Sequence, residues 1–258
     1  MREFQLDLNT EQDCARVPLG PIGGTSDPVR KASALKGWIS LKRAGDMGGS
    51  YQRDNPRRMR YLRSLGFRPE RPVYSCRQTH SQRVVVVTDQ QAGALSEIEA
   101  DGLLTSRRDA VLAVTVADCL PIYLVDMEHG AFALLHSGWR GTGIVVRALQ
   151  RMAEEYGSRP SQIAASIGPG IGVCCYRVEQ DRCRDFERRF GEKSVRKKEN
   201  TCFLDLAAAN TQLLKRSGVE TIHLCRNCTA CTPQLSSYRR DGPAFAHMLA
   251  CIGECQDD

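Results

Sequence analysis

Long apolar runs are missing from this sequence, and histidine is scarce in it. The chain has 258 residues and five histidines. No apolar run approaches the roughly 20 residues that a membrane-spanning helix needs. The N-terminal stretch MREFQLDLNTEQDC also lacks the basic-then-apolar pattern of a secretory signal. We therefore expect a cytoplasmic protein with no membrane partner.

Internal repeats, low-complexity tracts and nucleic-acid recognition motifs are also missing. The net charge of +6 is modest, and its densest part is residues 51–72, with seven arginines. No interleaved aromatics or recognition-helix motif accompany these arginines, so we expect a solvated helix face and no nucleic-acid partner. The alternative is a non-enzymatic module that binds RNA or an acidic partner, with a binding strength that falls steeply with salt.

Cysteine, in contrast, is abundant, with 12 residues. In a chain without an export signal we expect reduced thiols, some buried and some able to bind a metal. The segment CRNCTAC (225–231) has the CxxCxxC spacing of an iron–sulfur or zinc site. A fourth cysteine at a suitable short spacing is missing, so we expect Cys225, Cys228 and Cys231 to hold no cluster. We expect the same of the adjacent pair Cys174 and Cys175.

The composition is that of an ordinary globular protein, with 41% hydrophobic and 26% charged residues. Residues 19–50 are rich in glycine, serine and proline and predict an irregular segment. Apolar and β-branched runs predict strands at 83–89, 110–118, 121–126, 131–136, 163–168 and 221–225. Helical spacing predicts helices at 57–66, 143–157, 178–191 and 204–218, the last starting near Asp205, with a further terminal helix around His247. This order favours one α+β domain with a mixed sheet.

Three residues stand out as possible metal ligands. His80 lies among polar residues just before a strand, Cys119 lies at a strand end, and His136 ends a strand before the glycine-rich turn SGWRG. Two imidazoles and one thiolate suit zinc, and three protein ligands with an open fourth position are typical of a catalytic site. The spacing matches no compact motif, so structural roles remain open. For His129, His223 and His247 we expect surface or structural roles.

The turn after His136 is a candidate anion site. Arg140 precedes Thr142 and Gly143, where a helix is predicted to begin with Thr142 as its N-cap. A helix N-terminus beside an arginine can bind phosphate. An ordinary strand-to-helix turn with a surface arginine explains the same residues equally well.

Six segments together resemble a known family. They are RQTHSQRV (77–84), EADGLLT (99–105), TVADCLPIYLVD (115–126), LLHSGWRGT (134–142), SIGPGIGVCCYRV (166–178) and CTACTPQLSSYRRDG (228–242). The family is that of the bacterial purine nucleoside phosphorylases formerly called laccase-domain or multicopper polyphenol oxidoreductase proteins. The resemblance implies a single-domain α+β sandwich, with mixed β-sheets covered by helices, over residues 1–258.

The resemblance also implies an activity and a cofactor. The expected enzyme is a metal-dependent phosphorylase of adenosine, inosine, guanosine and methylthioadenosine that also deaminates adenosine. His80, Cys119 and His136 would hold zinc, or copper. Asp118 and Asp101 are candidate proton shuttles, although both suit turn caps. Gln78 joins Arg140, Thr142 and Gly143 as a candidate substrate contact, and we expect a monomer or weak dimer whose partners are nucleosides and phosphate.

The older family name suggests an alternative, a copper-dependent polyphenol oxidase. Two histidines and one cysteine also form a blue-copper ligand set. A multicopper laccase, however, needs a further copper cluster that is dense in histidine. The small number of remaining histidines argues against this alternative.

Overall fold

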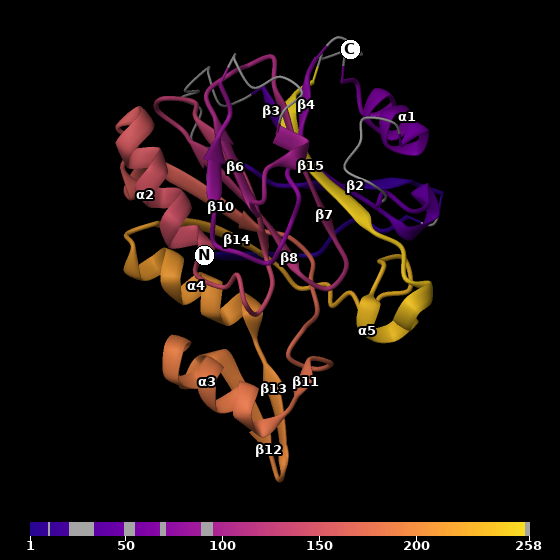
Figure 1. The fold of residues 1–258 in the computed structure, drawn as a ribbon, viewed down its shortest axis with the longest axis vertical. Coiled ribbons are helices and arrows are strands. Elements are labelled where there is room, and N and C mark those ends of the chain that lie inside the picture. The colour runs from indigo at the N-terminus through magenta and orange to yellow at the C-terminus, as the bar shows by residue number, and fades with distance from the viewer. Residues whose placement is uncertain (10, 21–33, 49–54, 68–70, 89–94, 256–258) are drawn as a thin grey trace.

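Two β-sheets form the body of the protein, and helices cover them (Figure 1). The structure, a computed structural model, describes residues 1–9, 11–20, 34–48, 55–67, 71–88 and 95–255. Its strands are β1 (Arg2–Phe4), β2 (Cys14–Val17), β3 (Leu35–Ser40), β4 (Val73–Tyr74), β5 (Val84–Val86), β6 (Gly102–Thr105), β7 (Val111–Val116), β8 (Leu120–Asp126), β9 (Phe132–Ser137), β10 (Ile163–Ile167), β11 (Arg177–Val178), β12 (Val195–Lys198), β13 (Thr201–Leu204), β14 (Thr221–Cys225) and β15 (Met248–Glu254).

The α-helices are α1 (Pro56–Ser64), α2 (Ile144–Tyr156), α3 (Gln180–Phe190), α4 (Leu206–Arg216) and α5 (Tyr238–Asp241). Short 3₁₀ helices lie at Lys42–Ala44, Leu95–Glu97, Pro160–Gln162, Glu192–Ser194 and Gly242–Ala244. Within the described ranges, no helix is long and apolar enough to cross a membrane.

The two large sheets are both mixed. The first has the order β1-β14-β10-β8-β9-β6-β5 and the second the order β2-β3-β15-β7-β4. A small sheet, β11-β13-β12, projects with α3 from the lower end of the body in Figure 1. The predicted α+β class with mixed sheets is therefore confirmed.

The sheets pack face to face because their central strands are apolar on both faces. In β8, Tyr123 and Val125 join the core between the sheets, whereas Ile122 and Leu124 join the core beneath the helices. Alternate residues of a strand point to opposite faces, so an uninterrupted apolar run is what a strand buried on both sides requires. The core between the sheets is thus shared by both of them, and the described residues form a single domain.

Helices cover the outer faces of both sheets. Residues of α2, α3 and α4 pack on the seven-stranded sheet, and Tyr61, Leu62 and Leu65 pack on the five-stranded one. Figure 1 accordingly shows α2 and α4 on one side of the body and α1 on the other. The basic segment contributes α1, which Asn55 caps by accepting hydrogen bonds from the amides of Arg57 and Arg58. Residues 51–54 and 68–70 of that segment lie outside the described ranges.

Several predictions of local structure need correction. Gly143, with a φ of 112° and no side-chain cap, precedes α2, so Thr142 is not its N-cap. The terminal helix expected around His247 is wrong, because that residue immediately precedes the buried strand β15. The irregular segment expected at 19–50 contains strand β3, while 21–33 and 49–50 are not described. Asp205, in contrast, caps α4 as expected by accepting from the Ala208 amide.

The cysteines are not all free thiols. A disulfide joins Cys183 on α3 to Cys202 on β13. The expectation of reduced thiols is therefore wrong for this pair, and the bond ties α3 to the small sheet. The other described cysteines, which include Cys119 and the five named above (Cys174, Cys175, Cys225, Cys228 and Cys231), are free.

Candidate metal centre

His80, Cys119 and His136 come together at one end of the seven-stranded sheet. Their potential ligand atoms all lie within 4.8 Å of one another. Cys119 lies in the turn between β7 and β8, and His136 lies in β9, where it faces Pro121 across the hairpin. His80 reaches the same place from the loop that precedes β5. The structure thus brings together the three residues that the sequence singled out.

Asp101 fixes the position of two of these residues. Its Oδ1 lies 2.8 Å from Nδ1 of His136 and accepts a hydrogen bond from the His80 amide at 3.0 Å. Its Oδ2 accepts from the Ser81 amide at 2.6 Å and the Ser81 hydroxyl at 2.7 Å. A carboxylate on the far nitrogen of a histidine ligand is a common feature of metal sites, where it fixes the ring and its tautomer.

The ionised forms of Asp101, Cys119 and His136 stabilise one another. Burial would raise the pKa of Asp101, but hydrogen bonds from His136 and Ser81 lower it to about 2. Burial likewise opposes ionisation of Cys119 and His136, yet their mutual attraction lowers the pKa of the thiol and raises that of the imidazole. The thiol is therefore readily ionised, which is the form that binds a metal.

Asp118 has a different environment from Asp101. Its carboxylate accepts hydrogen bonds from the Thr229 hydroxyl at 2.6 Å and the Arg239 amide at 2.7 Å. Its backbone has a φ of 80°, in the left-handed region that non-glycine residues rarely adopt. Both carboxylates are thus engaged in holding loops of the site.

A cavity of ≈ 480 Å³ opens over the three residues. This volume lies within the usual range for a small-molecule site. Its walls are Gln78, His80, Thr115, Ala117, Asp118, Cys119, His136, Trp139, Ile171, Tyr176, Arg182, Leu206, Tyr238, Arg239, Phe245 and His247. Apolar and aromatic side chains thus dominate the walls, with a few charged groups among them.

The candidate substrate contacts divide into two groups. Gln78 lines the cavity, and its side chain makes hydrogen bonds with Thr115 on β7. The exposed Arg140, the buried Thr142 and Gly143 are not among the lining residues. The Thr142 hydroxyl donates to the Gly138 carbonyl, and Gln82 donates to the Thr142 carbonyl beside the start of α2. The turn and the start of α2 therefore lie outside the cavity lining.

Sequence reasoning missed three polar residues of the cavity. Arg182 extends from α3 with its guanidinium carbon 4.5 Å from the centre of the Trp139 ring. Arg239 donates to the Arg177 carbonyl at 2.9 Å and lies 5.3 Å from the Tyr176 ring. His247 was expected to be structural. The stretch SSYRRDG, part of the segment 228–242 that carries the family resemblance, could have pointed to Arg239. Nothing in the sequence singled out Arg182.

The donor set fits a metal ion. Contact with Asp101 occupies Nδ1 of His136 and leaves Nε2 for a ligand bond. Gly138 provides the space: a Cβ there would lie 2.7 Å from Sγ of Cys119 and 3.1 Å from Cδ2 of His80. Zinc accepts two imidazoles and a thiolate, and catalytic zinc sites combine three protein ligands with an open fourth position. Copper accepts the same donors.

The fold and this site define a class of protein, a two-sheet α+β sandwich that presents a His–Cys–His group to a cavity. The chain belongs to the multi-copper polyphenol oxidoreductase laccase family, whose model matches residues 38–254. The family suspected from the six sequence segments is thus confirmed.

Several relatives carry a more specific name. A purine nucleoside phosphorylase of Corynebacterium glutamicum is 33% identical over 224 residues, which cover 83% of this chain and 90% of the relative. The purine nucleoside phosphorylase YlmD of Geobacillus stearothermophilus is 36% identical over 216 residues, 78% of each chain. Superposition on the crystal structure of YlmD covers 93% of this chain and all of YlmD, with a TM-score of 0.77 and 28% identity.

Removal of the Cys119 thiol is expected to empty the site. In Cys119→Ala only two imidazoles remain, and two ligands hold zinc poorly. We expect loss of the ion bound here with retention of the fold, because Cys119 lies in a turn rather than in the core. Metal analysis and circular dichroism measure both, with Cys14→Ala on β2 as the control. Undiminished occupancy of this site in Cys119→Ala would contradict the shared-ligand assignment.

A methyl group at Gly138 should have a similar effect for a steric reason. The added Cβ of Gly138→Ala would occupy the space between Cys119 and His80. We expect a metal affinity at least about tenfold lower, measured by competition with a chromophoric chelator. Gly20→Ala is the matched control, because no atom lies within 4 Å of a Cβ at that position. Equal affinities of the two variants would show that the space is not needed.

Proposed function

We propose that this chain is a metal-dependent purine nucleoside phosphorylase. The observation that carries the proposal is the cavity, which combines the His–Cys–His group with aromatic rings and two guanidinium groups. The aromatic rings suit the base of a nucleoside, the guanidinium groups suit phosphate, and the His–Cys–His group suits a metal ion. The names of the relatives, which match this chain over most of its length, support the same activity.

The aromatic walls suit a purine base. Tyr238 and Phe245 contact each other edge to face, with ring centres 5.1 Å apart, and Trp139 and Tyr176 lie on other parts of the wall. Flat apolar rings bind a planar heterocycle by stacking, which is worth about 1–3 kcal/mol per base in nucleic-acid complexes. Tyr238 is 58% exposed, unusually high for a large hydrophobic residue here, and a bound base would cover it.

Arg182 and Arg239 are the proposed phosphate contacts. Both line the cavity, whereas Arg140 does not. Guanidinium groups bind phosphate oxygens through paired, charge-assisted hydrogen bonds. The anion site expected at the start of α2 is therefore moved in this proposal to Arg182 on α3 and Arg239 on α5.

In phosphorolysis a phosphate oxygen attacks C1′ of the ribose while the bond from C1′ to the purine nitrogen breaks. The base leaves with the bonding electrons and takes up a proton. Arg182 and Arg239 would hold the phosphate, and the aromatic walls would hold the base, so that the reacting atoms meet in a fixed geometry. A bound zinc ion would supply Lewis-acid polarisation or an activated water. Asp101 would position His136, and Asp118 would position Arg239.

The finer parts of the proposal rest on the sequence resemblance. They are the substrates adenosine, inosine, guanosine and methylthioadenosine, and a second activity, deamination of adenosine. Zinc as the metal, a cytoplasmic location and a monomeric or weakly dimeric state are further parts of this proposal, carried over from the sequence analysis. The non-enzymatic alternative rests on the exposed arginines of α1, whose apolar residues pack on the five-stranded sheet.

The polyphenol oxidase alternative has one observation in its favour, the His–Cys–His donor set itself. The remaining histidines do not form a second cluster. His129 contacts Asp126, and His223 contacts the Gly20 carbonyl. His247, on the cavity wall, contacts Asp46 and Phe245. In the described part of the chain, the other candidate metal group consists of cysteines. A site of that composition does not suit multicopper oxidation.

Incubation with adenosine and phosphate tests the proposal directly. We expect ribose 1-phosphate in an amount equal to the free bases released, adenine from adenosine and hypoxanthine from any inosine formed, at a rate that depends on phosphate and falls after chelation. Inosine formed without phosphate would report deamination separately. The Cys119→Ala variant is the control for contaminating enzymes. Oxygen consumption with phenols and no phosphate-dependent product would instead favour the oxidase.

Substitution of Arg182 should weaken phosphate use selectively. A charge-assisted contact contributes about 1.5–3 kcal/mol, so Arg182→Ala should lower kcat/KM for phosphate roughly 10- to 100-fold. Metal content should not change, and deamination, which uses water, should change much less. The matched control is Arg184→Ala on the same helix, because Arg184 pairs with Asp181 outside the cavity.

The same assay discriminates between the two anion sites. Arg140→Ala should leave the KM for phosphate unchanged if Arg182 and Arg239 bind it. A large effect of Arg140→Ala together with none of Arg182→Ala would return the anion site to the turn before α2.

A further inference from the structure

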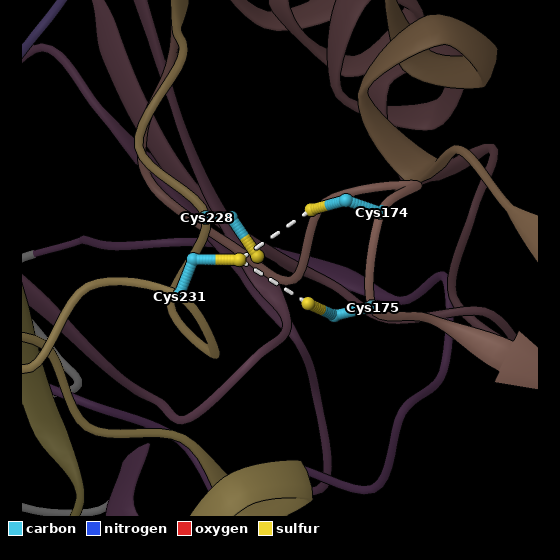
Figure 2. Close-up of side chains that lie close together, drawn as sticks. All are labelled: Cys174, Cys175, Cys228 and Cys231. Atoms are coloured by element: carbon cyan, nitrogen blue, oxygen red, sulfur yellow. Dashed lines mark hydrogen bonds between the residues drawn. The ribbon is translucent and has the colours of Figure 1, made fainter.

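Four cysteines from two distant segments converge beside the cavity. Figure 2 shows Cys174 and Cys175 on one loop facing Cys228 and Cys231 on another. The four sulfur atoms all lie within 4.8 Å of one another. Sγ of Cys231 lies 3.7 Å from that of Cys174 and 3.3 Å from that of Cys175. The sequence argument against a metal here was the lack of a fourth nearby cysteine, and the fold supplies two.

We propose that Cys174, Cys175, Cys228 and Cys231, here called the thiol tetrad, bind a single structural zinc ion. This site is separate from the His–Cys–His group and does not depend on the proposed enzymatic activity.

The size of the thiol tetrad suits one ion. With a zinc–sulfur bond of about 2.3 Å, four thiolates at the corners of a tetrahedron are about 3.8 Å apart. The separations of 3.7 and 3.3 Å lie just below this value, and the upper bound of 4.8 Å for all pairs lies above it. A disulfide would need sulfurs about 2.0 Å apart. In a four-iron cluster each thiolate binds a different iron, so the sulfurs would have to lie farther apart than around one ion.

The backbone around the thiol tetrad is already held in place. Gly170 pairs with Cys228 in an isolated bridge, and the Thr229 amide donates to the Gly170 carbonyl at 3.0 Å. The Gly172 amide donates to Sγ of Cys228 at 3.2 Å, which favours the thiolate. The amides of Cys231 and Thr232 both donate to the Cys228 carbonyl, closing the CxxC turn.

Three arginines lie beside the thiol tetrad. Zinc with four thiolates carries a net charge of about −2, which needs compensation at a partly buried site. Arg240 donates to the carbonyls of Thr229 and Thr232 at 2.8 and 3.1 Å. Arg239 donates to the Cys175 carbonyl at 3.3 Å, and Arg196 to the Val173 carbonyl at 3.3 Å. Three guanidinium groups are thus bound to the backbone of the two loops that carry the thiols.

The role of this ion would be to join two walls of the cavity. One loop leads from Ile171 to Tyr176, and the other leads to Tyr238 and Arg239, all of them lining residues. Four protein ligands leave no open coordination position, which is typical of a structural rather than a catalytic zinc. Binding energy at such a site contributes directly to the stability of the folded state.

Metal counting distinguishes the two sites. Protein purified without oxygen should contain about two ions per chain, and Cys231→Ser about one. Cys119→Ala should also contain about one, and the double variant almost none. Cys14→Ser, which removes a half-buried thiol far from either site in the sequence, should retain two. One ion in the wild type that Cys231→Ser leaves in place would overturn the proposal.

Cobalt substitution tests the ligands without relying on the folding of Cys231→Ser. In Cys119→Ala, Co²⁺ can occupy only the thiol tetrad, and four thiolates give intense sulfur-to-cobalt charge-transfer absorption. Zinc should also protect these four cysteines from iodoacetamide, as peptide mass spectrometry would show. Weak absorption with unprotected thiols, or a disulfide within the thiol tetrad under anaerobic conditions, would overturn the assignment.

Discussion

The buried carboxylate of Asp101 is the contact on which the candidate site depends. It is 1% exposed, and a buried charge of this kind is stable only when donors surround it. The donors come from the 79–81 loop and from His136 on β9. They hold His80 in the left-handed region, at a φ of 60°, where a histidine is rarely found. One charge thus fixes the orientation of two candidate ligands from separate parts of the chain.

The sequence was sufficient to predict those strands and helices whose residue pattern lies within one short segment. Strands such as β8 and β9 follow from apolar runs too short for helices, and α2 follows from its regular apolar face. His80 and His136 could be identified because each lies where packing does not call for an imidazole. Cys119 completed the set through zinc chemistry and the resemblance. Local pattern did not show the position of Asp101 in this network, because its donors lie 20 to 35 residues away along the chain.

The missed features all depend on contacts between distant segments. The thiol tetrad forms because a bridge brings Gly170 to Cys228, and cysteine spacing within either loop cannot show this. Arg182 lies on a charged helix with many arginines, and only the placement of α3 against Trp139 distinguishes it from the others. Thr142 is a good N-cap by residue type, but its hydroxyl bonds to Gly138 instead. A residue's preference for a capping position does not decide its role where the tertiary structure offers its side chain another hydrogen-bond partner.

The separation of 17 residues between Cys119 and His136 matches no metal-binding motif, but it is the length of a hairpin. β8 and β9 pair from Leu120 opposite Ser137 to Val125 opposite Phe132, and the turn between them closes the loop. Gain or loss of one residue within either strand would exchange its two buried faces and move one ligand to the wrong side. Loss or gain of one residue from each strand would preserve the pairing next to the turn, but it would change the distance from the turn to Cys119 and His136. The geometry of the metal site therefore depends on the lengths of β8 and β9, and insertions should be tolerated only outside these paired strands.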